Sequence, residues 1–138
     1  MPNPSKILIV DDDEDDRELF CEALSDISDS IKCVSALNWQ EALHALQNSN
    51  PLPDFIFLDL NLPRMSGTQC LAELKKIERL SSIPVIIYST SKSEEDREKT
   101  KELGSVYFLT KPSSMDQLKK ELEFVFEKKY ENSRSIEA

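Results

Sequence analysis

Short runs of apolar residues alternate along the chain with longer stretches in which apolar residues recur at helical spacing. The short runs are continuous and rich in β-branched residues, which is typical of strands buried on both faces of a sheet. Five such strands are predicted, at residues 6–10, 31–36, 54–58, 84–88 and 106–110. Five helices are predicted to follow them: residues 13–27, a helix capped by Asn38, a helix after Ser66-Gly67, residues 93–102, and a helix capped by Ser113.

This alternation predicts parallel strands joined by crossover connections, and so an α/β sheet covered by helices on both faces. The pattern runs over residues 6–127, which indicates one domain. Residues 1–5 precede the first strand, and residues 128–138 hold no periodic apolar pattern. Both ends are therefore predicted to be tails.

The fourth helix differs from the others because residues 93–102 contain almost nothing apolar, so that Leu103 anchors it nearly alone. One interpretation is a solvated helix stabilised by i,i+4 ion pairs such as Glu95–Lys99. The other is a weakly docked helix whose position shifts at low energetic cost. The sequence leaves both interpretations open.

Acidic residues are concentrated at the start of the chain. The 138 residues include 17 Lys and Arg against 26 Asp and Glu, a formal net charge of −9, and residues 1–30 hold ten of the acids but only two basic residues. A nucleic-acid binder needs clustered basic side chains for phosphate contacts, so that class is disfavoured. Only two glycines are present, which excludes the Gly-rich phosphate loops of nucleotide-binding proteins.

Three cysteines, Cys21, Cys33 and Cys70, are far apart in the sequence and odd in number. This usage argues against a disulfide framework or a zinc site and predicts small core residues in a reducing cytoplasm. No apolar run approaches the length of a membrane span, and the polar start lacks the apolar stretch of a signal peptide. We therefore expect a cytoplasmic protein that does not bind a membrane.

Polar residues follow four of the predicted strands. The first strand is followed by Asp11-Asp12-Asp13, the third by Asp59, the fourth by Ser89-Thr90-Ser91 and the fifth by Thr110-Lys111-Pro112. Open parallel sheets bind ligands beyond the carboxyl ends of their strands, where these residues would meet. Carboxylates so close together cannot all stay ionised without a cation, which implies a hard ion such as Mg²⁺.

A carboxylate beside Mg²⁺ can attack phosphorus and form an aspartyl phosphate. Phosphoryl transfer depends mainly on positioning and charge neutralisation, which Mg²⁺, Lys111 and the Ser89 hydroxyl would supply. A simpler explanation accounts for some of the acids, since Glu14, Asp15 and Asp16 suit the start of a helix and Asp13 would cap it. Asp59 alone could form a turn, but four such residues at four strand ends favour a site.

Four segments resemble the receiver domain of bacterial two-component response regulators: KILIVDDD, DFIFLDLNLPRMSG, IPVIIYSTS and YFLTKP. The resemblance covers about residues 6–127. It implies the flavodoxin-like (βα)5 fold with strand order 2-1-3-4-5. The DLNLP and STS segments further resemble the stand-alone receivers that include partners of bacterial phytochromes.

The resemblance assigns roles around a metal and a phosphoryl group. Asp59 matches the phosphoacceptor and Asp12 the direct Mg²⁺ ligand. Asp11 matches the acid that holds the metal through water, and Asn61 the residue that offers its backbone carbonyl to it. Asp13, a third acid where two are common, is interpreted as a helix cap, with a supporting role at the metal as the alternative.

Three further positions match the parts of a receiver that respond to phosphorylation. Ser89 matches the hydroxyl that moves to bond the phosphoryl group. Lys111 matches the lysine that neutralises a phosphoryl oxygen, and its bond to Pro112 is cis in the family. Phe108 falls at the aromatic switch position, whose ring turns inward when Ser89 moves; a Phe lacks the hydroxyl that a Tyr would present outward.

The function implied is a stand-alone phosphorylatable switch. A sensor histidine kinase or a histidine phosphotransfer protein would supply the phosphoryl group. The surface of the fourth helix, fifth strand and fifth helix would then signal to a downstream protein, with homodimerisation left open.

Two rival functions remain. A Mg²⁺-dependent phosphohydrolase of the haloacid dehalogenase type would use Asp11 as nucleophile in the pattern Asp11-x-Asp13, but it would leave Asp59 without a role. A binding module that keeps the fold without phosphorylation would leave the set of Asp12, Asp59 and Lys111 unexplained. Single Asn substitutions at Asp11 and Asp59 separate the phosphohydrolase from the switch, because the two functions use different nucleophiles. Retained partner binding by Asp59→Asn would favour the binding module.

Overall fold

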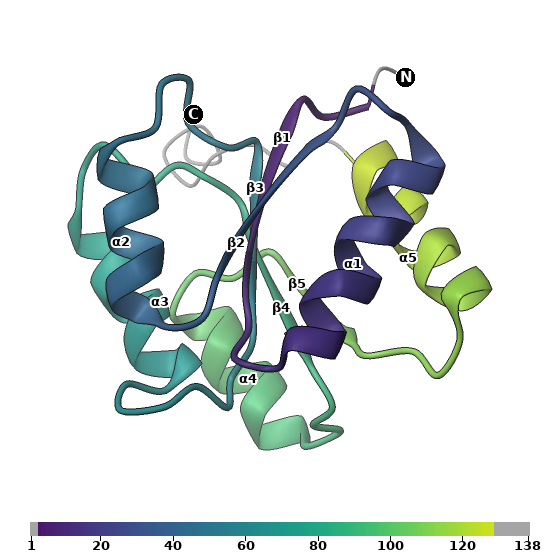
Figure 1. The fold of residues 1–138 in the computed structure, drawn as a ribbon. Helices are drawn as coiled ribbons and strands as arrows, with labels where there is room; N and C mark the ends of the chain where they lie inside the picture. Colours follow the sequence, from purple (N-terminus) through teal and green to yellow (C-terminus); the bar gives the residue numbers. More distant parts are fainter. Residues whose placement is uncertain (1–2, 129–138) are drawn as a thin grey trace.

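The structure, a computed structural model, describes residues 3–128, and its centre is a parallel five-stranded sheet with helices on both faces (Figure 1). The strands are β1 (Lys6–Val10), β2 (Lys32–Ala36), β3 (Phe55–Leu58), β4 (Val85–Ser89) and β5 (Tyr107–Thr110). The helices are α1 (Glu14–Ile27), α2 (Trp39–Gln47), α3 (Gly67–Lys76), α4 (Glu94–Glu102) and α5 (Met115–Glu127). The strand order is β2-β1-β3-β4-β5, which confirms the predicted flavodoxin-like fold.

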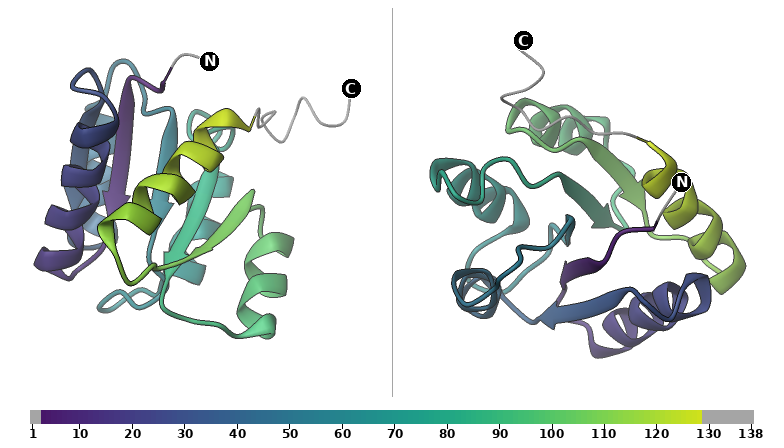
Figure 2. Two further views of the ribbon diagram at one scale, coloured as in Figure 1. Left: turned by 90° about the vertical axis from the view of Figure 1, so that its right-hand side faces the viewer. Right: turned by 90° about the horizontal axis from the view of Figure 1, so that it is seen from above.

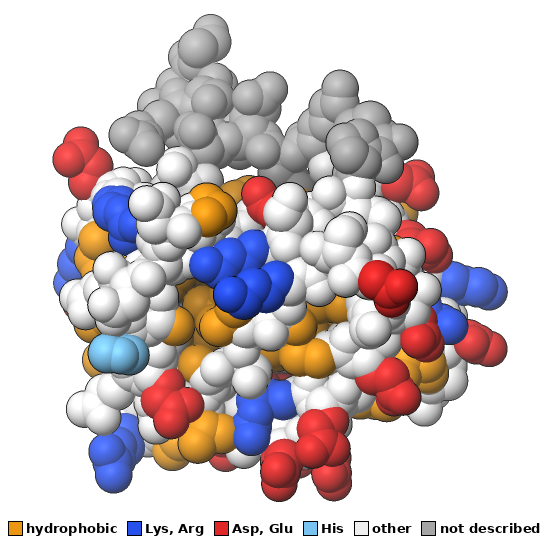
Figure 3. Space-filling view, turned by 45° about the horizontal axis from the view of Figure 1, so that its top comes forward, with side chains coloured by type: hydrophobic (Ala, Val, Ile, Leu, Met, Phe, Trp, Pro, Cys, Tyr) orange, Lys and Arg blue, Asp and Glu red, His pale blue; other side chains and the backbone are white. Residues whose placement is uncertain are grey.

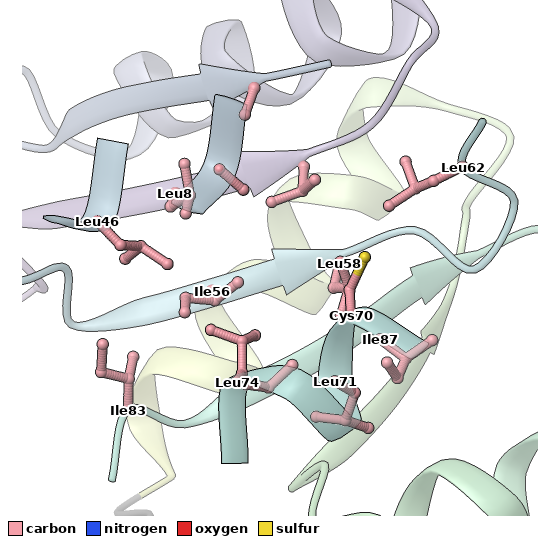
Figure 4. Close-up of a cluster of buried hydrophobic side chains, with 14 of the residues drawn as sticks. Leu8, Leu46, Ile56, Leu58, Leu62, Cys70, Leu71, Leu74, Ile83 and Ile87 are labelled. Carbon is pink, nitrogen blue, oxygen red and sulfur yellow. The ribbon is translucent and has the colours of Figure 1, made fainter. Parts of the chain in front are cut away.

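Residues of each strand alternate between two cores, one on each face of the sheet. In β1, Ile7 and Ile9 pack with buried residues of α1 and α5, whereas Leu8 and Val10 pack with those of α2 and α3. Figure 4 shows the second core, in which Ile56 of the sheet lies near Leu74 of α3. Because both faces are covered, the strands have the continuous apolar runs that predicted them. Figure 2 shows the two helical layers from the side and from above.

Side-chain caps fix where the helices begin. Asp13 caps α1 by accepting a hydrogen bond from the Asp16 amide, as predicted. Asn38 caps α2 by accepting from the Glu41 amide. The cap of α5 is Ser114, and the prediction of Ser113 was wrong because the helix begins at Met115 and the cap must reach the amide three residues on.

Helix α4 has Thr100 as its one buried residue, and Leu103 follows it, packed against the core. The Glu95–Lys99 ion pair expected from the sequence does not form in the described part of the chain. Arg97 instead reaches across to β5, where it donates to the Thr110 hydroxyl at 3.1 Å. Few apolar contacts therefore hold this helix, as its sequence predicted.

Two expectations about covalent geometry were wrong. Cys21 of α1 and Cys33 of β2 form a disulfide, because the fold brings their Cα atoms to 5.7 Å, a proximity that a separation of 12 residues does not reveal. Only Cys70 is a buried, free thiol within residues 3–128, so cysteine usage no longer supports a reducing compartment. The Lys111–Pro112 bond is trans, the intrinsically favoured isomer, whereas Asn50–Pro51 is cis.

Helix α1 carries a set of exposed acids, and Figure 3 shows acidic side chains crowded on that side of the molecule. They are Glu14, Asp15, Glu18, Glu22 and Asp26. His44 is exposed on α2. None of the helices formed within residues 3–128 combines the length and the apolar character that crossing a membrane requires. Of the predicted C-terminal tail, residues 128–138, all but Lys128 lie outside the described residues.

Candidate functional site

Backbone hydrogen bonds extend the sheet one residue beyond its strands and fix three side chains at one edge. The amide of Asp11 donates to the Ala36 carbonyl, that of Asp59 to the Val10 carbonyl and that of Lys111 to the Ser89 carbonyl, at 3.0, 3.0 and 2.8 Å. Each of these residues follows a buried strand directly. The sequence therefore places the polar side chains where the parallel strands end together.

Three carboxylates meet at this edge. One carboxylate oxygen from each of Asp11, Asp12 and Asp59 lies within 4.8 Å of the others. Asp11 is fully buried and Asp59 is 5% exposed, whereas Asp12 is open to solvent. Hard oxygen ligands at this spacing suit Mg²⁺, so the donor set fits the ion that the sequence implies.

Neighbouring amides orient the two buried carboxylates. The Asp13 amide donates to Oδ1 of Asp11 at 3.0 Å, and the Asn61 amide donates to Oδ1 of Asp59 at 3.2 Å. The second bond tightens the loop after β3 and keeps the exposed Asn61 next to Asp59. The structure thus places Asn61 beside the acidic cluster, and its carbonyl role at a metal stays a prediction.

Lys111 is the cation of the site. Its Nζ atom donates to Oδ2 of Asp11 at 2.8 Å, Oδ2 of Asp16 at 2.8 Å and Oδ2 of Asp59 at 3.2 Å. The ammonium also lies 5.3 Å from the centroid of the Tyr88 ring, within the range of a cation–π contact. Its three hydrogens are therefore all directed at carboxylates.

The pKa values of Asp11 and Lys111 are both raised, which favours the neutral form of the carboxyl and the charged form of the lysine. Burial raises the pKa of the Asp11 carboxyl, because the loss of water outweighs the hydrogen bonds from Lys111 and from the Asp13 amide. Burial alone would lower the pKa of Lys111, but its hydrogen bonds to Asp11 and Asp16 and the charge of Asp59 together raise it. Lys111 therefore stays charged. The Arg17 guanidinium donates to the Asp11 backbone carbonyl at 2.8 Å, so two cations stand among the four carboxylates of Asp11, Asp12, Asp16 and Asp59.

The Ser89 hydroxyl lies apart from this cluster. Ser89 is fully buried, and its Oγ accepts a hydrogen bond from the Ser91 amide at 3.2 Å; within residues 3–128 it bonds neither Asp59 nor Lys111. The Ser91 hydroxyl in turn donates to Oδ2 of Asp96 in α4 at 2.6 Å. A short chain of hydrogen bonds therefore leads from the loop after β4 into α4.

Phe108 is 9% exposed and belongs to the core on the α2–α3 face. The Arg97 guanidinium lies 4.7 Å from the centroid of its ring, while the same side chain donates to Thr110. Arg97 thus covers the aromatic side chain at the predicted switch position. Arg97 thereby joins α4 to β5. Phe108 itself lacks the hydroxyl that a Tyr would have at this position.

Two residues of the site were missed in the sequence. Asp16, explained there by the helix dipole, contacts Lys111 from the first turn of α1, and no local pattern in the sequence signals that contact. Gly67 begins α3 against the loop after β3, where an added Cβ would collide with the Asp59 carbonyl and lie 2.7 Å from the Leu60 Cα. The only hint of this role in the sequence was that the chain holds just two glycines.

Known proteins share both the sequence and the fold. The model of the response regulator receiver domain matches residues 7–123. Response regulator Rcp1 from Synechocystis is 34% identical over 122 residues, which cover 84% of this chain and 83% of Rcp1. The sensor histidine kinase CheAY of Helicobacter pylori is 29% identical over 117 residues, and the match spans 85% of this chain but only 14% of CheAY.

Solved structures agree with these matches. The phosphorylated cyanobacterial phytochrome response regulator RcpA superposes with a TM-score of 0.78 at 32% identity, covering 88% of this chain and 90% of RcpA. The Mn²⁺-bound form of Rcp1 gives a TM-score of 0.77 at 32% identity and covers 96% of this chain and all of that one. The fold and its acidic strand ends are those of a signalling domain. The chain belongs to the response regulator receiver domain family.

Proposed function

We propose that this chain is a phosphorylatable switch in which Asp59 accepts a phosphoryl group from a phosphohistidine with Mg²⁺ present. The observation that carries the proposal is the meeting of Asp11, Asp12, Asp59 and Lys111 at one edge of the sheet. RcpA, a relative of similar fold, is described in its phosphorylated form, and Rcp1 in a metal-bound form. Both support the same chemistry here.

Asp12, Asp59 and the backbone carbonyl of Asn61 would hold the ion directly, with Asp11 acting through water. When bound, Mg²⁺ neutralises negative charge on the phosphoryl oxygens. The Asp59 carboxylate oxygen forms the new bond to phosphorus as the bond from phosphorus to the imidazole nitrogen breaks, and the electron pair of that bond stays on the imidazole. Lys111, already 3.2 Å from Asp59, would contact a phosphoryl oxygen.

The response would begin at Ser89, whose hydroxyl moves to bond the phosphoryl group. Because Ser91 bonds both Ser89 and Asp96, this movement would disturb the start of α4. The helix has little apolar anchoring, so a small change in these bonds would shift it. Because the Arg97 guanidinium of α4 lies over the Phe108 ring, a shift of α4 would also move Phe108.

The output would be the surface formed by α4, β5 and α5. On α5, Phe124 is 43% exposed, and its ring centroid lies 5.8 Å from that of Tyr107 in β5. We propose that a downstream protein binds this surface, with a second copy of the chain as the alternative occupant. Four points stay predictions. They are the histidine kinase or phosphotransfer protein as the source of the phosphoryl group, the stand-alone organisation, the domain limits at residues 6–127 and the cytoplasmic location.

The test is phosphorylation by phosphoramidate, a small donor whose phosphorus–nitrogen bond imitates phosphohistidine. We expect intact-protein mass spectrometry to show a gain of one phosphoryl group with Mg²⁺, and almost none when the ion is chelated. Lys111→Ala should slow the gain strongly, and Lys119→Ala, which removes a lysine on α5, should not. Equal gain with and without Mg²⁺ would contradict the proposal.

A further inference from the structure

Asp16 holds Lys111 from helix α1, whereas Asp11 and Asp59 hold it from the ends of β1 and β3. Asp16 stands in the first turn of α1, where its backbone amide donates to Oδ1 of the capping residue Asp13 at 3.0 Å. Its Oδ2 atom accepts from Lys111 Nζ at 2.8 Å, as short as the bond from Lys111 to Asp11. A rigid, capped helix end thus anchors a flexible lysine.

The three carboxylates around Lys111 have different other roles. Asp11 and Asp59 belong to the group whose oxygens lie within 4.8 Å of one another and fit a metal ion, and Asp59 is also the proposed phosphoacceptor. Asp16 is outside that group. When a metal ion and a phosphoryl group engage Asp11 and Asp59, Asp16 is the partner that can still hold the ammonium.

We propose that Asp16 is a positioning residue that keeps the Lys111 ammonium at the place where phosphoryl oxygens arrive. The inference rests on the proposed function, since Lys111 acts there on the phosphoryl group. A lysine side chain has four rotatable bonds, so without a second anchor the ammonium samples positions that do not face Asp59. Holding a catalytic group in place is a large part of catalysis in phosphoryl transfer.

Asp16 also has an effect that slows phosphorylation, opposite to the effect of positioning Lys111. Its negative charge close to Asp59 repels the oxygens of an incoming phosphoryl donor, so removal of the charge alone would favour phosphorylation. Asp16→Asn keeps an oxygen acceptor for Lys111 and removes the charge, whereas Asp16→Ala removes both. The two variants together separate positioning from repulsion.

The experiment measures phosphorylation by acetyl phosphate in the full chain as a function of donor concentration, with Mg²⁺ present. We expect Asp16→Ala to lower the limiting rate constant by about tenfold. We expect Asp16→Asn to match or exceed the wild-type rate, because it keeps an acceptor for Lys111 and removes the repelling charge. The midpoint of Mg²⁺ binding, measured by calorimetry, should stay within about twofold in both variants, because Asp16 is not a ligand. Asp15→Ala is the matched control.

Asp15 is an exposed acid in the same helical turn, so its loss reproduces the change in helix dipole and net charge without touching Lys111. Action through Lys111 is tested in the Lys111→Ala background, where Asp16→Ala should cause no further loss. If Asp16→Ala lowers the phosphorylation rate further in the Lys111→Ala background, the inference is overturned. Phosphorylation of Asp16→Ala at the wild-type rate or faster also overturns it.

The proposed function fails by a different result. If the wild-type chain takes up no phosphoryl group, both the function and the inference that rests on it are overturned. If the wild type is phosphorylated and Asp16→Ala behaves as Asp15→Ala does, only the inference is overturned.

Discussion

Removal of one acid from the metal cluster should make the protein more stable when Mg²⁺ is absent. Asp12 offers a carboxylate oxygen within 4.8 Å of those of Asp11 and Asp59 and has no contact with Lys111. Folding therefore brings it against two like charges without a cation of its own. Asp12→Asn keeps the size of the side chain and removes this repulsion.

The magnitude follows from the spacing. Two unit charges 4.8 Å apart repel by about 0.9 kcal/mol in bulk water and by about 3.5 kcal/mol at an effective dielectric constant of 20. Because Asp12 is exposed, the lower figure applies to each of its two pairs. Lys111 donates to both Asp11 and Asp59 and offsets part of this repulsion, so we expect Asp12→Asn to raise the free energy of unfolding by about 1 kcal/mol in the absence of divalent ions.

Urea unfolding with a chelator and with Mg²⁺ measures the effect. In the wild type, Mg²⁺ at one hundred times its dissociation constant should add about 2.7 kcal/mol. Asp12→Asn should lose most of this increment, so that the order of stability reverses when the ion is added. Asp15→Asn, which changes a neighbouring acid outside the cluster, should respond to Mg²⁺ as the wild type does. A destabilised Asp12→Asn in chelator, or an undiminished response to Mg²⁺, would refute the reasoning.

Three further predictions concern packing, alkaline stability and thiols. Gly67→Ala forces a Cβ into the backbone after β3, so the free energy of unfolding, measured by thermal unfolding, should fall by about 1–3 kcal/mol. Phosphorylation should also be slower, and unchanged values of both would contradict the close approach. Burial raises the pKa of Tyr88 above its ordinary value of 10.0, so the folded state keeps a proton that the unfolded chain loses. The free energy of unfolding should therefore fall as pH rises above 10, and Tyr88→Phe should flatten that slope in urea titrations; an unchanged slope would exclude Tyr88 as its source. Without reductant, the unfolded chain should react with a thiol reagent at Cys70 alone, because Cys21 and Cys33 are paired, and three reactive thiols would show that they are not.

Most of the fold could be predicted because each buried strand is marked by its own continuous apolar run. The strand-end cluster followed from topology, since parallel strands bring Asp11, Asp59 and Lys111 to one edge whatever the details of the loops. Such inferences need only the order of the elements. They do not need the distance between any two side chains.

What the sequence missed depends on those distances. The pairing of Cys21 with Cys33 arises from the packing of α1 against the edge strand, and neither residue carries a local signal for it. The contact of Asp16 with Lys111 depends on the angle at which α1 leaves β1. The need for Gly67 comes from the backbone of another loop. Each is a through-space relation that periodicity and motif spacing do not encode.

The identity of the nucleophile tests the central claim most directly. The wild type, Asp59→Asn and Asp11→Asn would be incubated with acetyl phosphate and Mg²⁺ and compared by intact-protein mass spectrometry, with circular dichroism to confirm that each is folded. The account predicts a gain of one phosphoryl group in the wild type, a slower gain of one group in Asp11→Asn and none in Asp59→Asn. Phosphorylation of Asp59→Asn with none in Asp11→Asn would contradict it and assign the chemistry to a phosphohydrolase that uses Asp11.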